Sequence, residues 1–414
     1  MGSSCEQGRG DSEDNDIIWE HPSVKTIRCR GSPYEIGRTH GRCARQEILK
    51  NIATYTSFFQ ETAGLTWEQA RQKASETFIP VLGREYEEIL DEMKGIADGC
   101  GNGLSMEDIL TLNTRSEIAL TCYTDGCTSL TQSALFTSAT PSDGDGIRHH
   151  AMYLCQNWDW LAELGQGIVL LDIEPQPSHR FDESKNFHMK LLSEAGIVGK
   201  IGANSAGFGL CLNAIRSGAF NREGFPVHIL IRWMLQHCST VKEAKDTMDR
   251  FGTASTANYL LADRSGDFMD VEASPRGNTT ILPKLPAEDE GRQMAYVVHT
   301  NHLYGSNRPP KLVDHPAQNS FHRLARIQTL TEKDCKEGIL PSFESIRNRL
   351  SDQEGYPYSI CRDRPAGAVG MERMTTLATI MMEMVSGTIQ VIIGRPCLDN
   401  LPVVKWTFSD SKDN

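Results

Sequence analysis

A single cysteine stands between a glycine and a threonine in the stretch TDGCTSL, residues 124–130. A buried structural thiol needs no Asp-Gly turn in front of it, whereas a peptide bond that breaks at this point could use one. If the bond between Gly126 and Cys127 is cut, Cys127 becomes an N-terminal residue. Its own α-amine, with a reference pKa of about 8, can then serve as the base for its own thiol. This arrangement needs no separate histidine.

The glycine at position 126 fits the same chemistry. Without a Cβ, Gly126 can adopt the strained geometry in which a thiol attacks the preceding carbonyl. Most single cysteines that follow a glycine are nevertheless structural. These two residues alone therefore leave both interpretations open.

Other common site motifs do not occur in the sequence, which contains no P-loop, no HExxH zinc motif and no GxSxG elbow. His299 and His302, in the stretch HTNH, could be read as metal ligands. On a strand, an offset of three places them on opposite faces, so we expect no metal site there. The 12 cysteines form no CxxC pair and no zinc-type array.

The composition is that of a globular protein, with 39% hydrophobic and 23% charged residues in a chain of 414. The net charge of −12 argues against a nucleic-acid binder, because phosphate binding needs a basic face. No apolar run approaches the roughly 20 residues of a membrane span, and the polar, acidic start does not read as a secretory signal. The C-terminus is SKDN rather than an SKL-like import signal. We therefore expect a cytoplasmic protein whose cysteines are mostly free and buried.

The pattern of apolar residues changes along the chain. Residues 1–25 lack an apolar period and are expected to form a disordered acidic tail. Helical spacing dominates from about 35 to 120, and strand-like runs begin after Cys127. Helices are then expected near 226–252 and 319–351, followed by a hairpin that turns at Ser386-Gly387. Segregated runs of helices and strands predict an α+β fold.

Segments typical of one known family occur along the chain in that family's order. They are RGSPYEIGRTHG (30–41), MKGIADG (93–99), LTLNTRSE (110–117), DGCTS (125–129), QNWDW (156–160), SEAGIVGKIGANSAGFGLCLNAI (193–215), GFPVHILIR (224–232), VVHTNH (297–302), YPYSICR (356–362) and GRP (394–396). The chain thus resembles the isopenicillin N acyltransferase (acyl-CoA:6-aminopenicillanic acid acyltransferase) family, a peptidase C45-type branch of the N-terminal nucleophile hydrolases. The resemblance spans roughly residues 26–410, and the ordered set is much more specific than any one motif.

This resemblance implies a four-layer αββα sandwich that is made as an inactive precursor and cuts itself between Gly126 and Cys127. Residues 26–126 would become an α-chain and residues 127–414 a β-chain, and the two would stay together as one globular unit. The cleaved α-chain would then be the β-chain's partner. The resemblance implies no metal or redox cofactor. Coenzyme A, if used, would enter as a thioester acyl donor.

The family's catalytic residues can be carried over one by one. Cys127 stands at the place of the nucleophile, and Asp159 in NWD at the place of an acidic residue in the substrate pocket. Asn301 in HTNH matches an asparagine of the oxyanion hole, and Arg373 in ERMTTLATI falls where the family has a pocket arginine. Two alternatives stay open: Asp159 could pair with Arg373 as a buried ion pair, and Asn301 could merely cap a turn.

Three further residues are candidates for substrate binding. Asn204 in GANSAG matches an asparagine that related choloylglycine hydrolases bring near the nucleophile, although it could be a structural turn residue. Trp158 and Trp160 could line an acyl pocket, although tryptophans more often serve packing. Cys155 and Cys122 are expected to be core thiols.

The function implied is acyl transfer or amide hydrolysis on a small, secondary-metabolite-like substrate. A thioester acyl-enzyme on Cys127 would pass its acyl group to an amine or to water. The polar stretches 136–150 and 174–186 depart from the penicillin-forming pattern and leave the substrate open. The alternatives are an N-acyl amide hydrolase of the β-alanyl-dopamine hydrolase type, a thiol protease, and a non-catalytic binding protein of the same fold.

Overall fold

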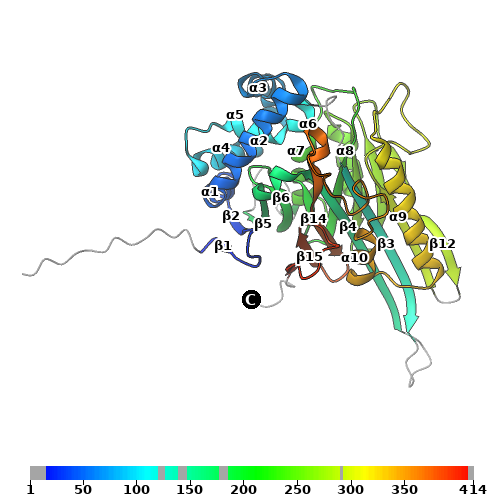
Figure 1. Ribbon diagram of the computed structural model, residues 1–414. Coiled ribbons are helices and arrows are strands. Elements are labelled where there is room, and N and C mark those ends of the chain that lie inside the picture. The colour runs from blue at the N-terminus through cyan, green and yellow to red at the C-terminus, as the bar shows by residue number, and fades with distance from the viewer. Residues whose placement is uncertain (1–14, 120–125, 139–146, 177–184, 290–291, 409–414) are drawn as a thin grey trace, which may run out of the picture.

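The computed structural model describes residues 15–119, 126–138, 147–176, 185–289 and 292–408 (Figure 1). Its centre consists of two β-sheets. The first, sheet A, has nine strands, and its order is β1 (Ile17–Ile18), β2 (Thr26–Gly31), β5 (Ile168–Pro175), β6 (Met189–Glu194), β7 (Ile201–Asn204), β8 (Phe208–Ala214), β9 (Ala257–Asp263), β10 (Phe268–Ala273) and β11 (Thr279–Ile281). Neighbouring strands are antiparallel except for the parallel pair β2 and β5.

The second sheet, sheet B, has seven antiparallel strands and carries Cys127. Its order is β12 (Lys284–Asp289), β13 (Arg292–His299), β3 (Gly126–Ser138), β4 (Ile147–Leu161), β14 (Met374–Glu383), β15 (Thr388–Ile393) and β16 (Val403–Thr407). The strand that begins at Gly126 therefore lies in the interior of the sheet, between β13 and β4. Both of its neighbours can present side chains to its first residues.

Helices cover the outer face of each sheet (Figure 1). On the side of sheet A the structure has α1 (Pro33–Cys43), α2 (Arg45–Ala63), α3 (Trp67–Glu85), α4 (Glu87–Cys100), α5 (Met106–Asn113), α6 (Arg115–Ile118), α7 (Val227–His237) and α8 (Val241–Phe251). On the side of sheet B it has α9 (Gln318–Lys336) and α10 (Phe343–Leu350). Short 3-10 helices, η1 (Ala162–Gly167) and η3 (Gly370–Arg373), flank β4 and β14.

The buried apolar side chains form separate cores between successive layers. One joins the helices to sheet A, one lies between the two sheets, and one joins sheet B to α9 and α10. Strand β8 shows how the period of two creates this arrangement: Leu210 faces the helices while its neighbour Cys211 faces the other sheet. The predicted four-layer αββα architecture is therefore confirmed, and Cys127 lies in the core between the sheets.

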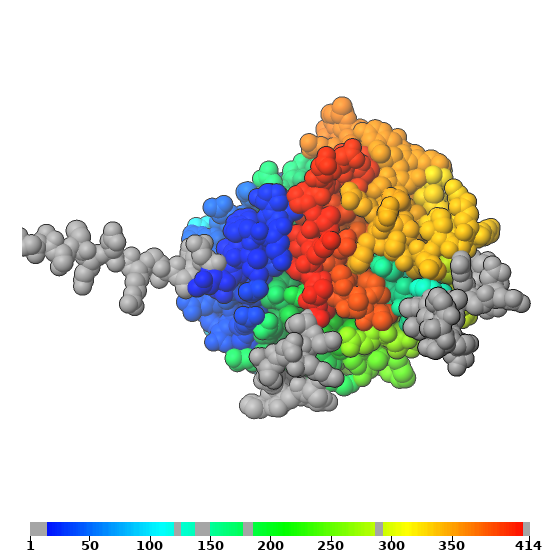
Figure 2. Space-filling view, turned by 90° about the horizontal axis from the view of Figure 1, so that it is seen from below, coloured from blue at the N-terminus to red at the C-terminus, as the bar shows by residue number. Residues whose placement is uncertain are grey.

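Part of the expected N-terminal tail is ordered. Residues 1–14 lie outside the described residues, but Ile17 pairs with Ile27 across β1 and β2. Glu20 accepts hydrogen bonds from Thr26 (2.9 Å) and from the Trp406 indole (2.8 Å). Figure 2 shows the blue N-terminal part of the chain directly beside the red C-terminal segment. The prediction of disorder was wrong for residues 15–25. The two apolar residues Ile17 and Ile18 are enough to form a short edge strand that pairs with β2.

Helices α1 and α4 approach each other unusually closely, at glycines. A Cβ on Gly37 or Gly41 would collide with the backbone carbonyl groups of Glu92 and Ile96. The spacing of four residues repeats on α4, where Gly95 and Gly99 meet the backbone of α1 in the same way. The glycines of RGSPYEIGRTHG and MKGIADG thus have a packing reason, since only hydrogen atoms fit between the two backbones.

Among the described helices, none has the length and apolar character needed to cross a membrane.

The close approach of α1 and α4 predicts that Gly41→Ala lowers the free energy of unfolding by about 1–3 kcal/mol or more, because the backbones must separate. Gly83→Ala in α3 is the matched control, since nothing lies within 4 Å of the added methyl group. It should leave stability unchanged or raise it by up to about 1 kcal/mol. Urea unfolding followed by circular dichroism measures both. Equal midpoints for the two variants would contradict the close approach.

Candidate functional site

Cys127 lies at the start of β3, where sheet register places it opposite Trp158 of β4. Its side chain is buried in the core between the sheets, with 2% of the residue exposed. Its backbone N–H donates a 2.8 Å hydrogen bond to Oδ1 of Asn301. The backbone nitrogen of Cys127, which would become an α-amine if the preceding peptide bond were cut, is therefore already hydrogen-bonded to the side chain of Asn301.

Asn301 follows the end of β13 and is held from three directions. Its Oδ1 accepts from Cys127 and from Nη2 of Arg323 (2.8 Å), and its Nδ2 donates to the carbonyl oxygen of Ala214 (3.0 Å). A side-chain amide carries two N–H donors, so Ala214 uses one and the second can serve a reacting oxygen. These contacts reach other elements rather than its own turn, so the interpretation of Asn301 as a mere turn cap is wrong.

Arg323 of α9 connects the outer helix layer to the nucleophile. The residue is buried, and its Nη1 donates to the carbonyl oxygen of Cys127 (2.5 Å) and to Oγ1 of Thr128 (3.0 Å). Together with the bond to Asn301, this guanidinium fixes both the backbone of Cys127 and the amide that faces it. Charge-assisted hydrogen bonds of this kind are the strong ones. The sequence interpretation did not include Arg323.

Asp159 lies directly across the sheet from Gly126. It is fully buried, and its Oδ1 accepts a 2.7 Å hydrogen bond from Oγ1 of Thr376. A Cβ on Gly126 would lie 2.6 Å from Nη1 of Arg362 and 3.4 Å from Oδ2 of Asp159. The close approach of Arg362 leaves no room for a side chain at position 126, so glycine is needed here for space.

The arginine at the site is Arg362 and not Arg373. Arg373 ends η3, and its guanidinium pairs with Glu61 (3.1 Å) and Glu163 (3.3 Å) near the surface. Its proposed pairing with Asp159 is therefore wrong. The buried Arg362 lies against Gly126 instead, because β14 begins one residue after Arg373 and carries that side chain past the end of β4.

The backbone of Arg362 is fixed beside Asp159 through Thr376. The N–H of Arg362 donates to Oγ1 of Thr376 (2.9 Å), the same hydroxyl that donates to Asp159, and the carbonyl oxygen of Arg362 accepts from the N–H of Thr376 (3.1 Å). The guanidinium also lies 5.4 Å from the ring centroid of Tyr358. The segment YPYSICR thus delivers the site arginine that the sequence interpretation assigned to a later position.

Cys127 lines a small cavity between the sheets and helix α7. Its other walls include Trp158, Arg115, Lys200 and His228, and its volume is about 30 Å³. That space is enough for at least one water molecule next to Cys127.

Two buried cations line this cavity and share one carboxylate behind it. Glu194 accepts from Nη2 of Arg115 (2.7 Å), from Nζ of Lys200 and from the hydroxyl of Tyr55 (2.5 Å). Burial alone would raise the pKa of Glu194, but the charges of Arg115 and Lys200 outweigh it and hold that pKa far below its usual range. Lys200 also lies 3.8 Å from the ring centroid of Trp158. The carboxylate thus keeps two positive charges beside the nucleophile.

His228 is the histidine that lines the cavity, but its ring is already used. Nδ1 lies 2.7 Å from the carbonyl oxygen of Gly199, and Nε2 faces Nη1 of Arg115. Burial, reinforced by the charge of Arg115, lowers the pKa of His228 well below its usual range. The neutral ring therefore donates from Nδ1 and accepts at Nε2. Its lone pair is directed at Arg115, so it is a poor candidate for the base of Cys127.

The three candidate binding residues have different outcomes. Trp158 lines the cavity with Cys127, whereas Trp160 packs against Phe58 and donates from its indole to the hydroxyl of Tyr55 (2.9 Å). Asn204 is the last residue of β7, directly before a turn. Its amide donates to the carbonyl groups of Leu235 (2.8 Å) and Cys238 (2.7 Å), and its oxygen accepts from the N–H groups of Ala206 and Phe208. Its proposed role in substrate binding was wrong, because turn and helix backbone use its whole hydrogen-bonding capacity.

The histidines of HTNH have separate partners. His299 is buried at the end of β13, and its Nε2 lies 3.2 Å from Oε1 of Glu272. His302 has its Nδ1 2.8 Å from the hydroxyl of Ser320. They do not form a pair of metal ligands.

Cys155 is a buried core thiol, as expected, and burial raises its pKa to about 12. Cys122 lies outside the described residues.

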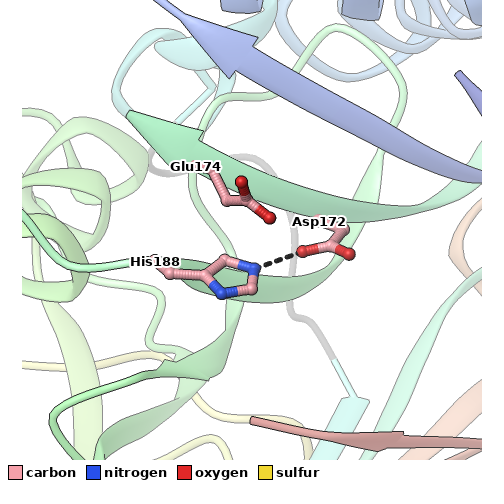
Figure 3. A group of neighbouring side chains, drawn as sticks. All are labelled: Asp172, Glu174 and His188. Atoms are coloured by element: carbon pink, nitrogen blue, oxygen red, sulfur yellow. Dashed lines mark hydrogen bonds and ion pairs between the residues drawn. The ribbon is translucent and has the colours of Figure 1, made fainter. Parts of the chain in front are cut away.

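One group of side chains in the described part of the chain has the geometry of metal ligands. Asp172, Glu174 and His188 offer ligand atoms within 4.8 Å of one another on β5 and just before β6 (Figure 3). Arg30 already binds Glu174 through two 2.8 Å hydrogen bonds, and Nζ of Lys190 lies 3.1 Å from Asp172. Opposite charges thus alternate across neighbouring strands. A metal ion would have to displace Arg30 from Glu174 and Lys190 from Asp172.

Comparison with known proteins gives a consistent relationship. The family model described as acyl-coenzyme A:6-aminopenicillanic acid acyl-transferase matches residues 147–397. Over 372 residues the chain is 29% identical to the acyl-coenzyme A:6-aminopenicillanic-acid-acyltransferase 40 kDa form of Emericella nidulans, an alignment that covers 89% of this chain and 92% of that protein. The matched region includes Asp159, Asn301 and Arg362.

Solved structures with a similar course of the chain are more distant. A variant of the conjugated bile acid hydrolase from Clostridium perfringens has a TM-score of 0.34 at 12% identity, covering 70% of this chain and 93% of that one. The penicillin V acylase from Agrobacterium tumefaciens has a TM-score of 0.28 at 12% identity, covering 66% and 76%. These similarities are too low to add to the description of the site.

The residues that the sequence interpretation missed were present in its own motifs. Arg115 lies in LTLNTRSE, Lys200 in the long segment 193–215, His228 in GFPVHILIR and Arg362 in YPYSICR. These four residues could have been identified because each is a charged or titratable residue in a segment that resembles the family. Arg323 has no such signal, since it lies on a polar amphipathic helix.

The shared carboxylate predicts a large stability loss for Glu194→Gln, because Arg115 and Lys200 would stay buried without it. Removing one partner of a buried ion pair costs about 3–5 kcal/mol. Glu163→Gln is the matched control, since it breaks only the exposed pair with Arg373 and should cost less than about 1 kcal/mol. Denaturant unfolding at pH 7 compares them. If the two variants lose the same stability, Glu194 does not hold the two cations.

Proposed function

Because the chain belongs to the acyl-coenzyme A:6-aminopenicillanic acid acyltransferase family, we propose that it is a self-processing enzyme that transfers acyl groups through Cys127. The observation that carries the proposal is the 2.8 Å hydrogen bond between the N–H of Cys127 and Asn301 beside a cavity lined by two cations. A core thiol would need no side chain to hold its backbone nitrogen. Membership of the family makes acyl transfer to or from nitrogen the reaction class.

In the first step, the precursor, or zymogen, cuts itself. Sγ of Cys127 attacks the carbonyl carbon of Gly126, and the acyl group moves from nitrogen to sulfur. Water then hydrolyses the thioester and releases the part of the chain that ends at Gly126. Arg362 lies against Gly126 and supplies a positive charge where negative charge develops on that carbonyl. The peptide nitrogen of Cys127 becomes a free α-amine.

In turnover, the new amine is the base. One of its N–H groups keeps the bond to Oδ1 of Asn301, which leaves the nitrogen lone pair to accept the thiol proton of Cys127. The amine takes the role of base because Nε2 of His228, the histidine that lines the cavity, faces Arg115 and not the thiol. The thiolate attacks an amide or thioester carbonyl, and the second N–H of Asn301 donates to the tetrahedral oxyanion. The thioester acyl-enzyme then passes its acyl group to an amine or to water.

The cavity wall favours a particular substrate. Arg115 and Lys200 line the same cavity as Cys127, and a substrate carboxylate would bind there by charge-assisted hydrogen bonds. Trp158 supplies an apolar surface for the rest of a small molecule. A coenzyme A thioester is the proposed acyl donor, and a small amine-bearing acid, such as a secondary metabolite, the acceptor. No step in this sequence needs a metal or redox cofactor.

Self-cleavage predicts that the purified 46.0 kDa wild type separates into pieces of roughly 14 and 32 kDa on a denaturing gel. Cys127→Ala should remain one chain, because no thiol is present to attack Gly126. Intact mass and N-terminal sequencing of the larger piece should place Cys127 first. A folded wild type that stays whole would reject self-processing and favour the non-catalytic binding protein.

The position of Arg362 predicts a contrast between two arginines. Arg362→Ala should lower kcat/KM about 100-fold, because a buried positive charge beside Gly126 and the nucleophile is removed, whereas Arg373→Ala should change it less than about threefold. The assay uses acetyl-coenzyme A with and without 6-aminopenicillanic acid, followed by release of the coenzyme A thiol. Thiol release that needs the amine indicates transfer, and release without it indicates hydrolysis. A larger loss for Arg373→Ala would overturn the assignment.

A further inference from the structure

Two cysteines from separate parts of the chain meet behind the site. Cys361 follows α10 and immediately precedes Arg362, while Cys397 follows β15. Their Sγ atoms lie 2.9 Å apart although the residues are 36 positions apart in the sequence. A disulfide bond length is about 2.05 Å, so a movement of less than about 1 Å would join them. Cys361 is buried, whereas Cys397 is partly exposed and can meet a reagent from solvent.

We propose that Cys361 and Cys397 are a site of reversible covalent modification, at which a low-molecular-weight disulfide such as oxidised glutathione converts the two thiols to a disulfide. Other described cysteines have different surroundings. The thiol of Cys100 faces the carbonyl oxygen of Arg45, and that of Cys335 accepts from the side chain of Gln132. Neither of these two thiols faces a second cysteine, in contrast to Cys361 and Cys397.

The surroundings of the pair favour reaction. The guanidinium of Arg395 lies beside both thiols and interacts electrostatically with each of them. A positive charge stabilises the thiolate, which is the form that attacks a disulfide. Burial keeps the pKa of Cys361 high, at about 12, so the buried thiol is not the first to react. The partly exposed Cys397 is the point of entry.

The exchange balances in two steps. Sγ of Cys397 attacks one sulfur of oxidised glutathione, which forms a mixed disulfide and releases one glutathione thiolate. Sγ of Cys361 then attacks Sγ of Cys397 and releases the second glutathione. The two cysteines lose two electrons and two protons, and the oxidised glutathione gains both to become two thiols. A dithiol reductant reverses the sequence.

The crosslink would fix the position of Arg362. The segment around Cys397 already holds the loop that carries Arg362, because Nη1 of Arg395 pairs with Asp363 at 2.6 Å. Arg347 of α10 also donates to the carbonyl oxygen of Pro396. A disulfide next to Arg362 replaces these exchangeable contacts with a covalent one. Since Arg362 lies against Gly126, oxidation would restrict the motion of a residue at the site.

The test is a peptide map of the full-length folded protein after incubation with oxidised glutathione. Free thiols are alkylated under denaturing conditions, and the digest is analysed without reductant. We expect one crosslinked pair that contains Cys361 and Cys397, about 2 Da lighter than the sum of the two reduced peptides and reversed by dithiothreitol. Digestion of the native protein after Glu354, which lies in the exposed part of the same loop, should slow at least twofold on oxidation.

Two variants serve as controls. Cys397→Ser should abolish the crosslink and the change in cleavage after Glu354, and circular dichroism checks that this variant, whose altered side chain is partly exposed, is folded. Cys100→Ser should leave both unchanged. The proposal is overturned if Cys361 and Cys397 of the wild type remain separately alkylated, if Cys397 stops at the mixed disulfide with glutathione, or if oxidation does not change the cleavage rate. These readouts do not depend on enzymatic activity.

Discussion

The hydrogen bond from the backbone N–H of Cys127 to Asn301 is the interaction on which the site depends. It can form only if β13 delivers Asn301 next to the first residues of β3, which the sheet register ensures by pairing His299 with Ser129. Arg323 then fixes both partners from the outer helix layer, by binding the amide oxygen of Asn301 and the carbonyl oxygen of Cys127. A single buried guanidinium therefore links the outer helix layer to sheet B, and Asn301 continues the link to Ala214 of sheet A.

Burying charged groups near this nitrogen costs free energy, and here one buried carboxylate compensates two buried cations. Glu194 is bound by Arg115 and Lys200 at once, and the hydroxyl of Tyr55 adds a further donor. Because the carboxylate stands behind the cavity wall, the two cations rather than the anion face the nucleophile. The same cluster occupies the lone pair of His228. The arrangement thus removes the nearby imidazole as a base and leaves the nitrogen of Cys127 itself as the natural candidate.

The α+β class was predictable from the residues because its signal is local, whereas the four-layer arrangement was implied by the family resemblance. Alternation in β8 and helical spacing before residue 120 are properties of neighbouring residues, and they identified strands, helices and the α+β class. The site was predictable only in part. Cys127 and Asn301 were found and do meet, but Arg362 was assigned eleven positions too late, because the choice between two arginines depends on where β14 begins. Arg323 was missed because an arginine on a polar helix is expected to face solvent, although it lies on the buried side of α9, next to Leu324 and one turn before Ile327.

The glycine before the nucleophile shows why motif and geometry must be read together. Backbone freedom was the physical reason expected for Gly126, and the structure adds a second reason, because Arg362 and Asp159 fill the space that a Cβ would need. A side chain at that position would push a guanidinium and a carboxylate away from the peptide bond that they flank. The same logic applies to Gly37 and Gly41, where backbone rather than side chains fills the space. In both places the matched glycines record a close approach, of backbone to backbone in the helix pair and of charged side chains to backbone at Gly126.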